Sequence, residues 1–234
     1  MSELGIGIRR LRLRGVGRDY GVSFVDQRGQ VRPLAMVAGE ISTGKSSVLE
    51  FIDYCLGAGE HPSHPEIQRK VRAALLEVEL GDSVTVIERP VFTTSSVATV
   101  HQCSLDGLSD PHTTIRKVLR PAGDPESLST LLLDYCGLRG VVLKEAPTKA
   151  ASETDPLSFR DVMWLAFLPN RRLDNENLLH ENTLMQALKM RQVIEVVFDV
   201  HDNALAELGD RLTSLSKEQE RLQAEVESVR RFLN

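Results

Sequence analysis

The sequence is short of cysteine and of aromatic residues, and each shortage excludes a class of protein. Cys55, Cys103 and Cys136 are widely spaced and form no CxxC pair, so neither a disulfide framework nor a cysteine-rich zinc site is expected. Aromatic residues make up 5% of the chain, which is too few for a row of stacking platforms on single-stranded nucleic acid.

Long apolar runs and a surplus of positive charge are also missing. No stretch approaches the roughly 18 consecutive apolar residues of a membrane-spanning helix. The first residues, MSELGIGIRRLRLRGVG, carry charges where a signal peptide is apolar. We therefore expect no membrane partner and predict a cytoplasmic protein. The net charge of −5 gives no global positive field, so any nucleic-acid site has to be a local patch.

The composition itself is that of a globular protein. Its 234 residues are 41% hydrophobic and 26% charged, enough for one large domain or a domain with an extension. Alternating apolar residues predict a strand over 6–14, and a second strand follows over 20–26. The continuous apolar run 33–39 predicts a strand buried on both faces, and residues 45–56 have the pattern of a helix that follows it.

The later part of the chain is predicted to contain strands, helices and one long loop. The turn at Gly81 and Asp82 predicts a hairpin, and two prolines break residues 142–156 into a loop. The expected elements are strands 74–80, 83–90 and 97–105, and helices 125–138, 156–168 and 181–200.

The last segment has a heptad pattern. Apolar residues recur in alternating steps of three and four over about four heptads, with Gln219 filling one seam position and charged residues beside the seam. This pattern predicts the root of a coiled-coil arm that pairs with a partner helix, and we expect the sequence to be a fragment cut through a longer arm. The alternative is one amphipathic helix packed on a globular core. The apolar seam residues are Leu205, Leu208, Leu212, Leu215, Leu222, Val226, Val229 and Leu233.

The stretch GEISTGKS matches the phosphate-loop pattern G-x-x-x-x-G-K-[ST] in full. Glycines let the backbone turn so that successive N–H groups and a helix N-terminus point at phosphate oxygens. Lys45 is expected to reach the β- and γ-phosphates of ATP, and Ser46 to ligate Mg²⁺. The alternative is a glycine-bearing turn with a solvated lysine. The expected nucleotide-binding residues are Gly39, Glu40, Ile41, Ser42, Thr43, Gly44, Lys45, Ser46 and Ser47.

Residues 6–57 resemble the start of the head of SMC-like, ABC-type ATPases, which open with an alternating strand, a short strand, the phosphate loop and a helix. The terminal heptads agree with the long arm of that family. The resemblance implies an α/β P-loop NTPase fold with a mixed sheet and helices, its N-terminal lobe in 1–200 and its arm starting in 201–234. It also implies dimerisation on ATP, as a homodimer or with a C-terminal lobe of the same protein, and action on DNA in repair, chromosome maintenance or defence.

The chain also departs from this family. Family members read GxNGSGKS, whereas this chain has EIST between its two loop glycines. Asn170 stands where a metal-contacting glutamine is expected, and its alternative is a helix C-cap. Asp134 is followed by Tyr135 instead of a catalytic glutamate, and LSKEQ at 215–219 falls inside the heptads. We therefore expect nucleotide binding without efficient hydrolysis in this chain, with Lys45 and Asn170 as the catalytic candidates.

Five arginines are candidates for phosphate or DNA contacts. Arg10, Arg12 and Arg14 alternate along the first predicted strand and so share one of its faces. Arg69 and Arg72 precede a later predicted strand, where the resemblance places an arginine loop near the nucleotide. A basic ridge meets phosphates without sequence preference, and the alternative for both groups is a solvated charged face.

Two other functions fit the same motif. The first is a nucleotide-binding interaction module that recruits a partner through its coiled coil with negligible turnover. The second is a P-loop kinase with an appended helix, which predicts a small-molecule acceptor and no dimer on ATP. An acidic DE strand and a signature motif after the arm, in a full-length sequence, would favour the ATPase over both.

Overall fold

The computed structural model divides into two compact units. It describes residues 5–93, 95–119, 121–144, 154–173 and 183–233. The units are Met1–Arg139 with Ser158–Glu176, and Gly140–Leu157 with Asn177–Asn234. Of the described residues, 183–200 fall in the same unit as the last helix, and the predicted start of an arm at residue 201 stays a prediction. None of the helices in the described ranges combines the length and the hydropathy that a membrane crossing requires.

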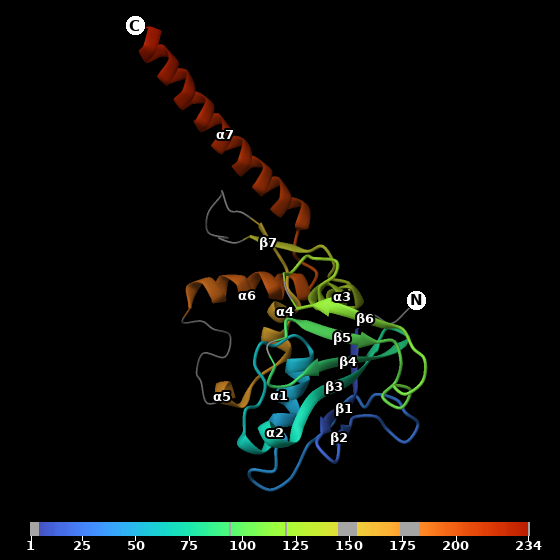
Figure 1. The fold of residues 1–234 in the computed structure, drawn as a ribbon. Helices are drawn as coiled ribbons and strands as arrows, with labels where there is room; N and C mark the ends of the chain where they lie inside the picture. Colours follow the sequence, from blue (N-terminus) through green and yellow to red (C-terminus); the bar gives the residue numbers. More distant parts are fainter. Residues whose placement is uncertain (1–4, 94, 120, 145–153, 174–182, 234) are drawn as a thin grey trace. The chain divides into compact units, whose positions relative to one another are not determined.

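A six-stranded antiparallel sheet is the framework of the first unit (Figure 1). Its strand order is β2-β1-β3-β4-β5-β6. The unit contains both helices and a sheet, as expected, and each described pair in the sheet is antiparallel. The strands are β1 (Ile6–Gly15), β2 (Tyr20–Ser23), β3 (Val71–Leu80), β4 (Ser83–Pro90), β5 (Val97–His101) and β6 (Thr114–Val118).

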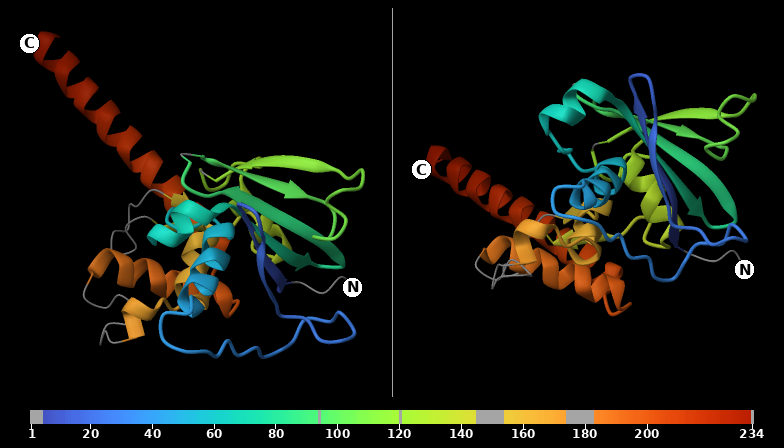
Figure 2. Two further views of the ribbon diagram at one scale, coloured as in Figure 1. Left: turned by 60° about the horizontal axis from the view of Figure 1, so that its bottom comes forward. Right: turned by 90° about the horizontal axis from the view of Figure 1, so that it is seen from below.

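Helix α1 packs against one face of this sheet, across β1, β3 and β4 (Figure 2). Helices α3 and α4 pack on each other and begin at serine caps, because the hydroxyls of Ser127 and Ser158 accept from backbone N–H groups of the first turn. The helices of this unit are α1 (Lys45–Cys55), α2 (Pro65–Lys70), α3 (Leu128–Tyr135), α4 (Phe159–Ala166) and α5 (Asn170–Leu173).

Strand β3 is buried on both faces, which explains its nearly continuous apolar sequence VRAALLEVEL. Ala74 lies opposite Arg89 in the strand register, and Arg89 contacts the end of α1, so Ala74 and the residues in step with it face α1. On the other face, Leu75 packs against Leu105 from the loop between β5 and β6. The sheet therefore has a helix face and a loop face.

The predicted strand over residues 33–39 is wrong, because this segment is irregular and exposed. Leu34 and Met36 are 83% and 88% exposed, and the backbone of residues 33–38 makes no hydrogen bond within the described part of the chain. A strand buried on both faces needs strand neighbours and covering layers. The described residues supply neither to this segment, so its apolar side chains face solvent.

Most other predicted elements are confirmed, with ends that differ by a few residues. The hairpin across Gly81 forms from β3 and β4, the helix over 45–56 is α1, and the run LSTLLLDY is the helix α3. The predicted loop 142–156 is wrong at both ends, where β7 (Val142–Lys144) and β8 (Thr154–Pro156) pair antiparallel. Its middle, 145–153, lies outside the described residues.

The second unit combines the β7–β8 pair with helices α6 (Leu184–Val197) and α7 (Asn203–Leu233). Gln192 on α6 acts as a neighbour for β7: its Oε1 accepts from the Lys144 N–H at 2.9 Å, and its Nε2 donates to the Lys144 carbonyl at 3.0 Å. The predicted heptad segment is a continuous helix, α7. Five of its seam residues are exposed: Leu208, Leu212, Leu215, Leu222 and Val226.

Candidate phosphate-binding site

The glycine–lysine loop (residues 39–46) leads directly into α1, whose first residue is Lys45. Two loop residues have left-handed backbone angles, Gly44 with a φ of 87° and Ser42 with a φ of 65°. Glycine adopts this conformation freely, whereas a side chain with a Cβ is strained there. The loop and the helix start thus lie where the motif predicts them, although the segment before them is not a strand.

The Lys45 ammonium is folded back onto its own loop. Its Nζ donates to the Gly39 carbonyl at 2.9 Å and also to the Glu40 carbonyl. The Thr43 hydroxyl lies 3.5 Å from Nζ and donates to the same Glu40 carbonyl at 2.8 Å. These partners are neutral and lie in an exposed loop. A phosphate oxygen is a stronger acceptor for an ammonium than a neutral carbonyl, because both partners are then charged.

The N-terminus of α1 is not capped by a side chain. No side-chain hydrogen bond caps Gly44, and the first helical turn contains no acidic residue. The first hydrogen bond of the helix runs from the Val48 N–H to the Gly44 carbonyl, at 3.1 Å. The preceding N–H groups and the positive end of the helix dipole are therefore suited to an anion.

A cavity of about 670 Å³, the loop cavity, opens beside this helix start. Its volume is in the range of small-molecule sites, roughly 300–1,000 Å³. Residues 42–48 line this cavity, together with Leu13, Tyr20 and Lys70. Of the predicted nucleotide residues, 42–47 line the cavity. The remaining three, 39–41, are exposed and are not part of its wall.

Tyr20 and Glu66 line the loop cavity together with Lys70, and neither Tyr20 nor Glu66 was predicted from the sequence. Tyr20 has a flat ring, on which a nucleotide base can stack. The Arg18 guanidinium lies 4.7 Å from the centre of this ring. Lys70 donates to Glu66 at 2.5 Å, and this hydrogen bond raises the pKa of Lys70 and lowers the pKa of Glu66. These residues follow no local motif, because only the pairing of β1 with β2 and β3 brings them near the loop.

The far end of α1 is fixed by the buried side chain of Arg89. The guanidinium donates to the carbonyls of Tyr54 and of Ala58, the latter at 2.7 Å, and lies 3.7 Å from the Tyr54 ring centre. Burial lowers the pKa of Arg89, and the negative end of the α1 dipole offsets part of the cost of burying its charge. The Tyr54 hydroxyl donates to the Pro90 carbonyl at 2.5 Å, so α1 is anchored to β4.

A second cavity of about 880 Å³ contains Asn170 in its wall. Asn170 is the first residue of α5, so the alternative of a helix C-cap is wrong. Lys45 lines the loop cavity, whereas Asn170 does not, so the structure does not bring the two catalytic candidates into one cavity. A metal contact by Asn170 stays a prediction. Beside it, Arg160 binds Asp53 through two nitrogens, at 2.6 and 3.1 Å, and ties α4 to α1.

Arg10, Arg12 and Arg14 lie on the loop face of the sheet, away from α1. Leu13 lies opposite Ala74, which faces α1, and it lines the loop cavity. Alternation then directs the three arginines to the opposite side of β1. They consequently share no cavity wall with the glycine–lysine loop.

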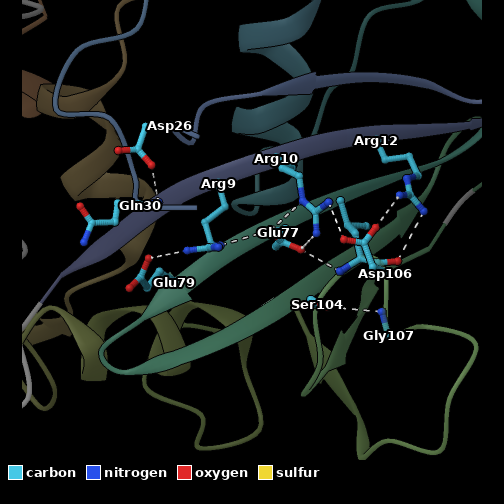
Figure 3. A network of polar contacts seen from close by, with 11 residues as sticks. Arg9, Arg10, Arg12, Asp26, Gln30, Glu77, Glu79, Ser104, Asp106 and Gly107 are labelled. Carbon is cyan, nitrogen blue, oxygen red and sulfur yellow. Dashed lines mark hydrogen bonds and ion pairs between the residues drawn. The ribbon is translucent and has the colours of Figure 1, made fainter. Parts of the chain in front are cut away.

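Each of these three arginines also has a carboxylate partner, and Figure 3 shows those of Arg10 and Arg12. Arg10 binds the buried carboxylate of Glu77 at 2.6 Å and Asp106 at 2.7 Å. Arg12 lies 3.6 Å from the other oxygen of Asp106, and Arg14 binds Glu88 at 2.8 Å. The positive ridge that the sequence suggested is therefore largely neutralised, and its contact with phosphate or DNA stays a prediction.

Glu77 is the centre of this network. Its carboxylate accepts hydrogen bonds from Arg9 at 3.2 Å, from two nitrogens of Arg10 at 2.9 and 2.6 Å, and from the Leu105 N–H at 2.7 Å. Burial alone would raise the pKa of Glu77, but the hydrogen bonds from Arg10 and Leu105 outweigh burial and lower it. Glu77 thereby joins β1 and β3 to the loop that covers them.

The other two arginine candidates lie at the junction of α2 and β3. Arg69 is exposed in the last turn of α2. The Arg72 guanidinium donates to the backbone carbonyls of Gln68 at 3.3 Å and Val71 at 3.5 Å. Neither of them lines the loop cavity, so a nucleotide contact by either one stays a prediction.

No protein-family model matches this chain, and a search of the curated proteins found no match. The function is therefore inferred from the residues and the geometry described above.

Proposed function

We propose that this chain binds ATP with Mg²⁺ at the glycine–lysine loop and forms the N-terminal lobe of an SMC-like, ABC-type ATPase head. N–H groups of the loop and of the first turn of α1 would hold the phosphates, and Lys45 would reach the β- and γ-phosphates. The Ser46 hydroxyl is a hard oxygen ligand, of the kind that Mg²⁺ prefers. In the full-length protein, two heads would close on ATP and act on DNA, with α7 as the root of the arm.

The loop cavity is the observation that supports this proposal best. It lies beside an uncapped helix start and a lysine whose acceptors, among the described residues, are neutral, and Tyr20 belongs to its lining. A nucleoside triphosphate offers the matching chemistry, since its phosphates are anionic and its base is flat. Mg²⁺ would neutralise part of the phosphate charge, and Ser46 would orient the ion.

The exposed apolar segment 33–38 supports the assignment to one lobe of a divided head. An unpaired, strand-length run with exposed Leu34 and Met36 is a template for pairing with another strand. The acidic strand that the resemblance implies after the arm is a candidate neighbour for this segment. Residues 33–38 form no strand here, but they are suited to become one when another segment pairs with them.

Calorimetric titration with ATP and Mg²⁺ tests the proposal. We expect saturable binding to the wild type and, for Lys45→Ala, an affinity lower by at least about tenfold, because a charged hydrogen bond is lost. Arg28→Ala is the matched control, since it removes an exposed positive charge from a turn outside the loop cavity. Equal binding by wild type and Lys45→Ala would contradict the nucleotide site.

The alternative function, an interaction module with negligible turnover, is favoured by the exposed seam of α7. Leu212→Asp combined with Leu222→Asp should weaken self-association or binding of a partner helix, because charges would enter the apolar seam. Sedimentation of the variant and of a Lys217→Asp, Glu218→Lys control measures the effect. No ATP hydrolysis by the full-length protein, together with loss of pairing in the seam variant, would favour the module over the ATPase.

A further inference from the structure

Two histidines of the first unit face each other through their ring nitrogens. His101 is the last residue of β5, and His112 lies two residues before β6. The His101 Nδ1 and His112 Nε2 atoms are 2.9 Å apart, and the ring planes are inclined by 62°. Neither residue belongs to the loop cavity.

The outer contacts of the two rings determine where their hydrogens lie. His112 Nδ1 is 2.7 Å from the Asp110 carbonyl oxygen, which can only accept, so Nδ1 carries the hydrogen. His101 Nε2 is 3.1 Å from one oxygen of Glu88, whose other oxygen accepts from Arg14 at 2.8 Å. His101 Nε2 is therefore the donor in this contact.

In the tautomers that these outer contacts select, each of the two facing nitrogens presents a lone pair. The Thr114 hydroxyl, 3.3 Å from His101 Nδ1, adds a third oxygen or nitrogen atom to the same place. Two lone pairs at 2.9 Å repel each other unless a proton or a metal ion lies between them. In metal sites, ligating histidines donate their other ring N–H to a carboxylate or a backbone carbonyl, and these two histidines do the same.

We propose that His101 and His112 form a binding site for a divalent transition-metal ion, with Cu²⁺ and Ni²⁺ as the preferred class. Metal–nitrogen bonds of about 2.0–2.1 Å at a right angle place the two nitrogens about 2.9 Å apart, which is their separation here. Right angles between ligands belong to the tetragonal geometry of Cu²⁺ and Ni²⁺. Among the described residues no group of three or more histidine, cysteine or carboxylate side chains is placed to hold a metal, so water would fill the other positions.

The sheet holds the pair in place. His101 is opposite Thr114 in the β5–β6 register, and the Gln102 N–H donates to the Thr113 carbonyl at 2.9 Å. These contacts hold together the two ends of the loop that carries His112. Glu88, on β4, fixes the outer nitrogen of His101. A site with one ligand on a paired strand and the other in a loop whose ends are hydrogen-bonded needs little rearrangement to bind an ion.

Titration of the metal-free protein with NiCl₂ and CuCl₂, followed by calorimetry, tests this proposal. We expect about one bound equivalent in the wild type and an affinity at least about tenfold lower in His112→Gln. Glu88→Gln keeps both ligands and should lower the affinity about tenfold, because it changes the partner of His101. His64→Gln is the matched control, since it removes an exposed histidine outside the pair, and it should bind as the wild type does.

A spectroscopic signature separates this site from binding elsewhere on the chain. The Cu²⁺ complex of the wild type should show electron paramagnetic resonance couplings to two nitrogens, and one coupling should disappear in His112→Gln. Circular dichroism in EDTA checks that each variant is folded, and Glu88→Gln provides the test if His112→Gln is not. Unchanged affinity and spectra in both variants would overturn the proposal. Lys45→Ala should bind the metal normally, so failure of the nucleotide site would leave this result interpretable.

Discussion

The glycine–lysine loop and the loop face of β1 both carry positive charge, and they differ in what already binds it. Lys45 donates to neutral carbonyls in an exposed loop. Arg10 donates to Glu77, which is fully buried. An incoming phosphate can replace a carbonyl at little cost, whereas removing Arg10 from Glu77 would take the closest ion partner from a buried carboxylate.

Basic residues in a sequence therefore have to be interpreted together with the acidic groups that lie near them in the fold. Both regions match a pattern associated with phosphate, one through a glycine-rich motif and the other through alternating arginines. The patterns do not show whether acidic partners are nearby in the fold. The glycine–lysine loop is suited to binding a ligand, while the loop face of β1 is suited to joining two strands and a covering loop.

The largest expected effect comes from breaking the buried network. Glu77→Gln should lower the free energy of unfolding by about 2–3 kcal/mol, because Arg9 and Arg10 would lose charged hydrogen bonds to a buried carboxylate. Urea unfolding measures it. The control is Glu79→Gln, whose carboxylate is partly exposed and binds Arg9 alone, and it should change stability by less than about 1 kcal/mol. Equal effects from both variants would contradict the assigned role of Glu77.

The same carboxylate should make stability depend on pH. The folded state lowers the pKa of Glu77, so its stabilisation is complete above the unfolded value of about 4.3 and is lost as pH falls through the folded value. Unfolding free energies of the wild type and Glu77→Gln should therefore converge in acid. A constant difference between them down to about pH 2 would show that Glu77 titrates normally.

Removing a more exposed arginine pair should cost much less. Arg12→Ala should lower the free energy of unfolding by no more than about 1 kcal/mol, because its partner Asp106 is largely exposed and the ions are 3.6 Å apart. ATP binding should stay the same, since Arg12 lies on the face of β1 away from α1. Weaker ATP binding in this variant would show that the loop face of β1 also takes part in ATP binding.

A glycine at the strained loop position should stabilise the protein slightly. Ser42 has a φ of 65°, and Ser42→Gly relieves this strain while adding freedom to the unfolded chain, for a net gain of about 0.5 kcal/mol. Thermal unfolding measures the gain. Ser42→Val is the comparison, since a β-branched residue should destabilise the left-handed conformation. A more stable valine variant would indicate a different loop conformation.

The smallest expected effect is that of Lys45→Ala on stability. Its unfolding free energy without nucleotide should lie within about 0.5 kcal/mol of the wild type, because the lost hydrogen bonds join exposed, neutral acceptors. The same substitution should reduce ATP affinity strongly. A large loss of stability without nucleotide would place Lys45 in the same class as Arg10, a residue that supports the fold.

Local patterns predicted the first unit in large part. The hairpin across Gly81 follows from alternation and turn chemistry, and α1 follows from the glycine–lysine loop. The predicted strand over 33–39 failed because an apolar run shows a tendency to be buried, and it does not show that a neighbouring strand is present. Tyr20 was missed as a cavity residue for a similar reason, since its place depends on which strand lies beside β1.

The sequence alone determined the glycine–lysine loop, the start of α1 and the heptads of α7, because each depends on residues close together in the chain. Tertiary structure decided the rest: which arginines are neutralised, which residues face Lys45 across the loop cavity, and that His101 meets His112. Electrostatic pairing acts over a few ångströms in space, between residues that are up to 107 positions apart in the chain, as Asp53 and Arg160 are. Only the order and register of the strands set those distances.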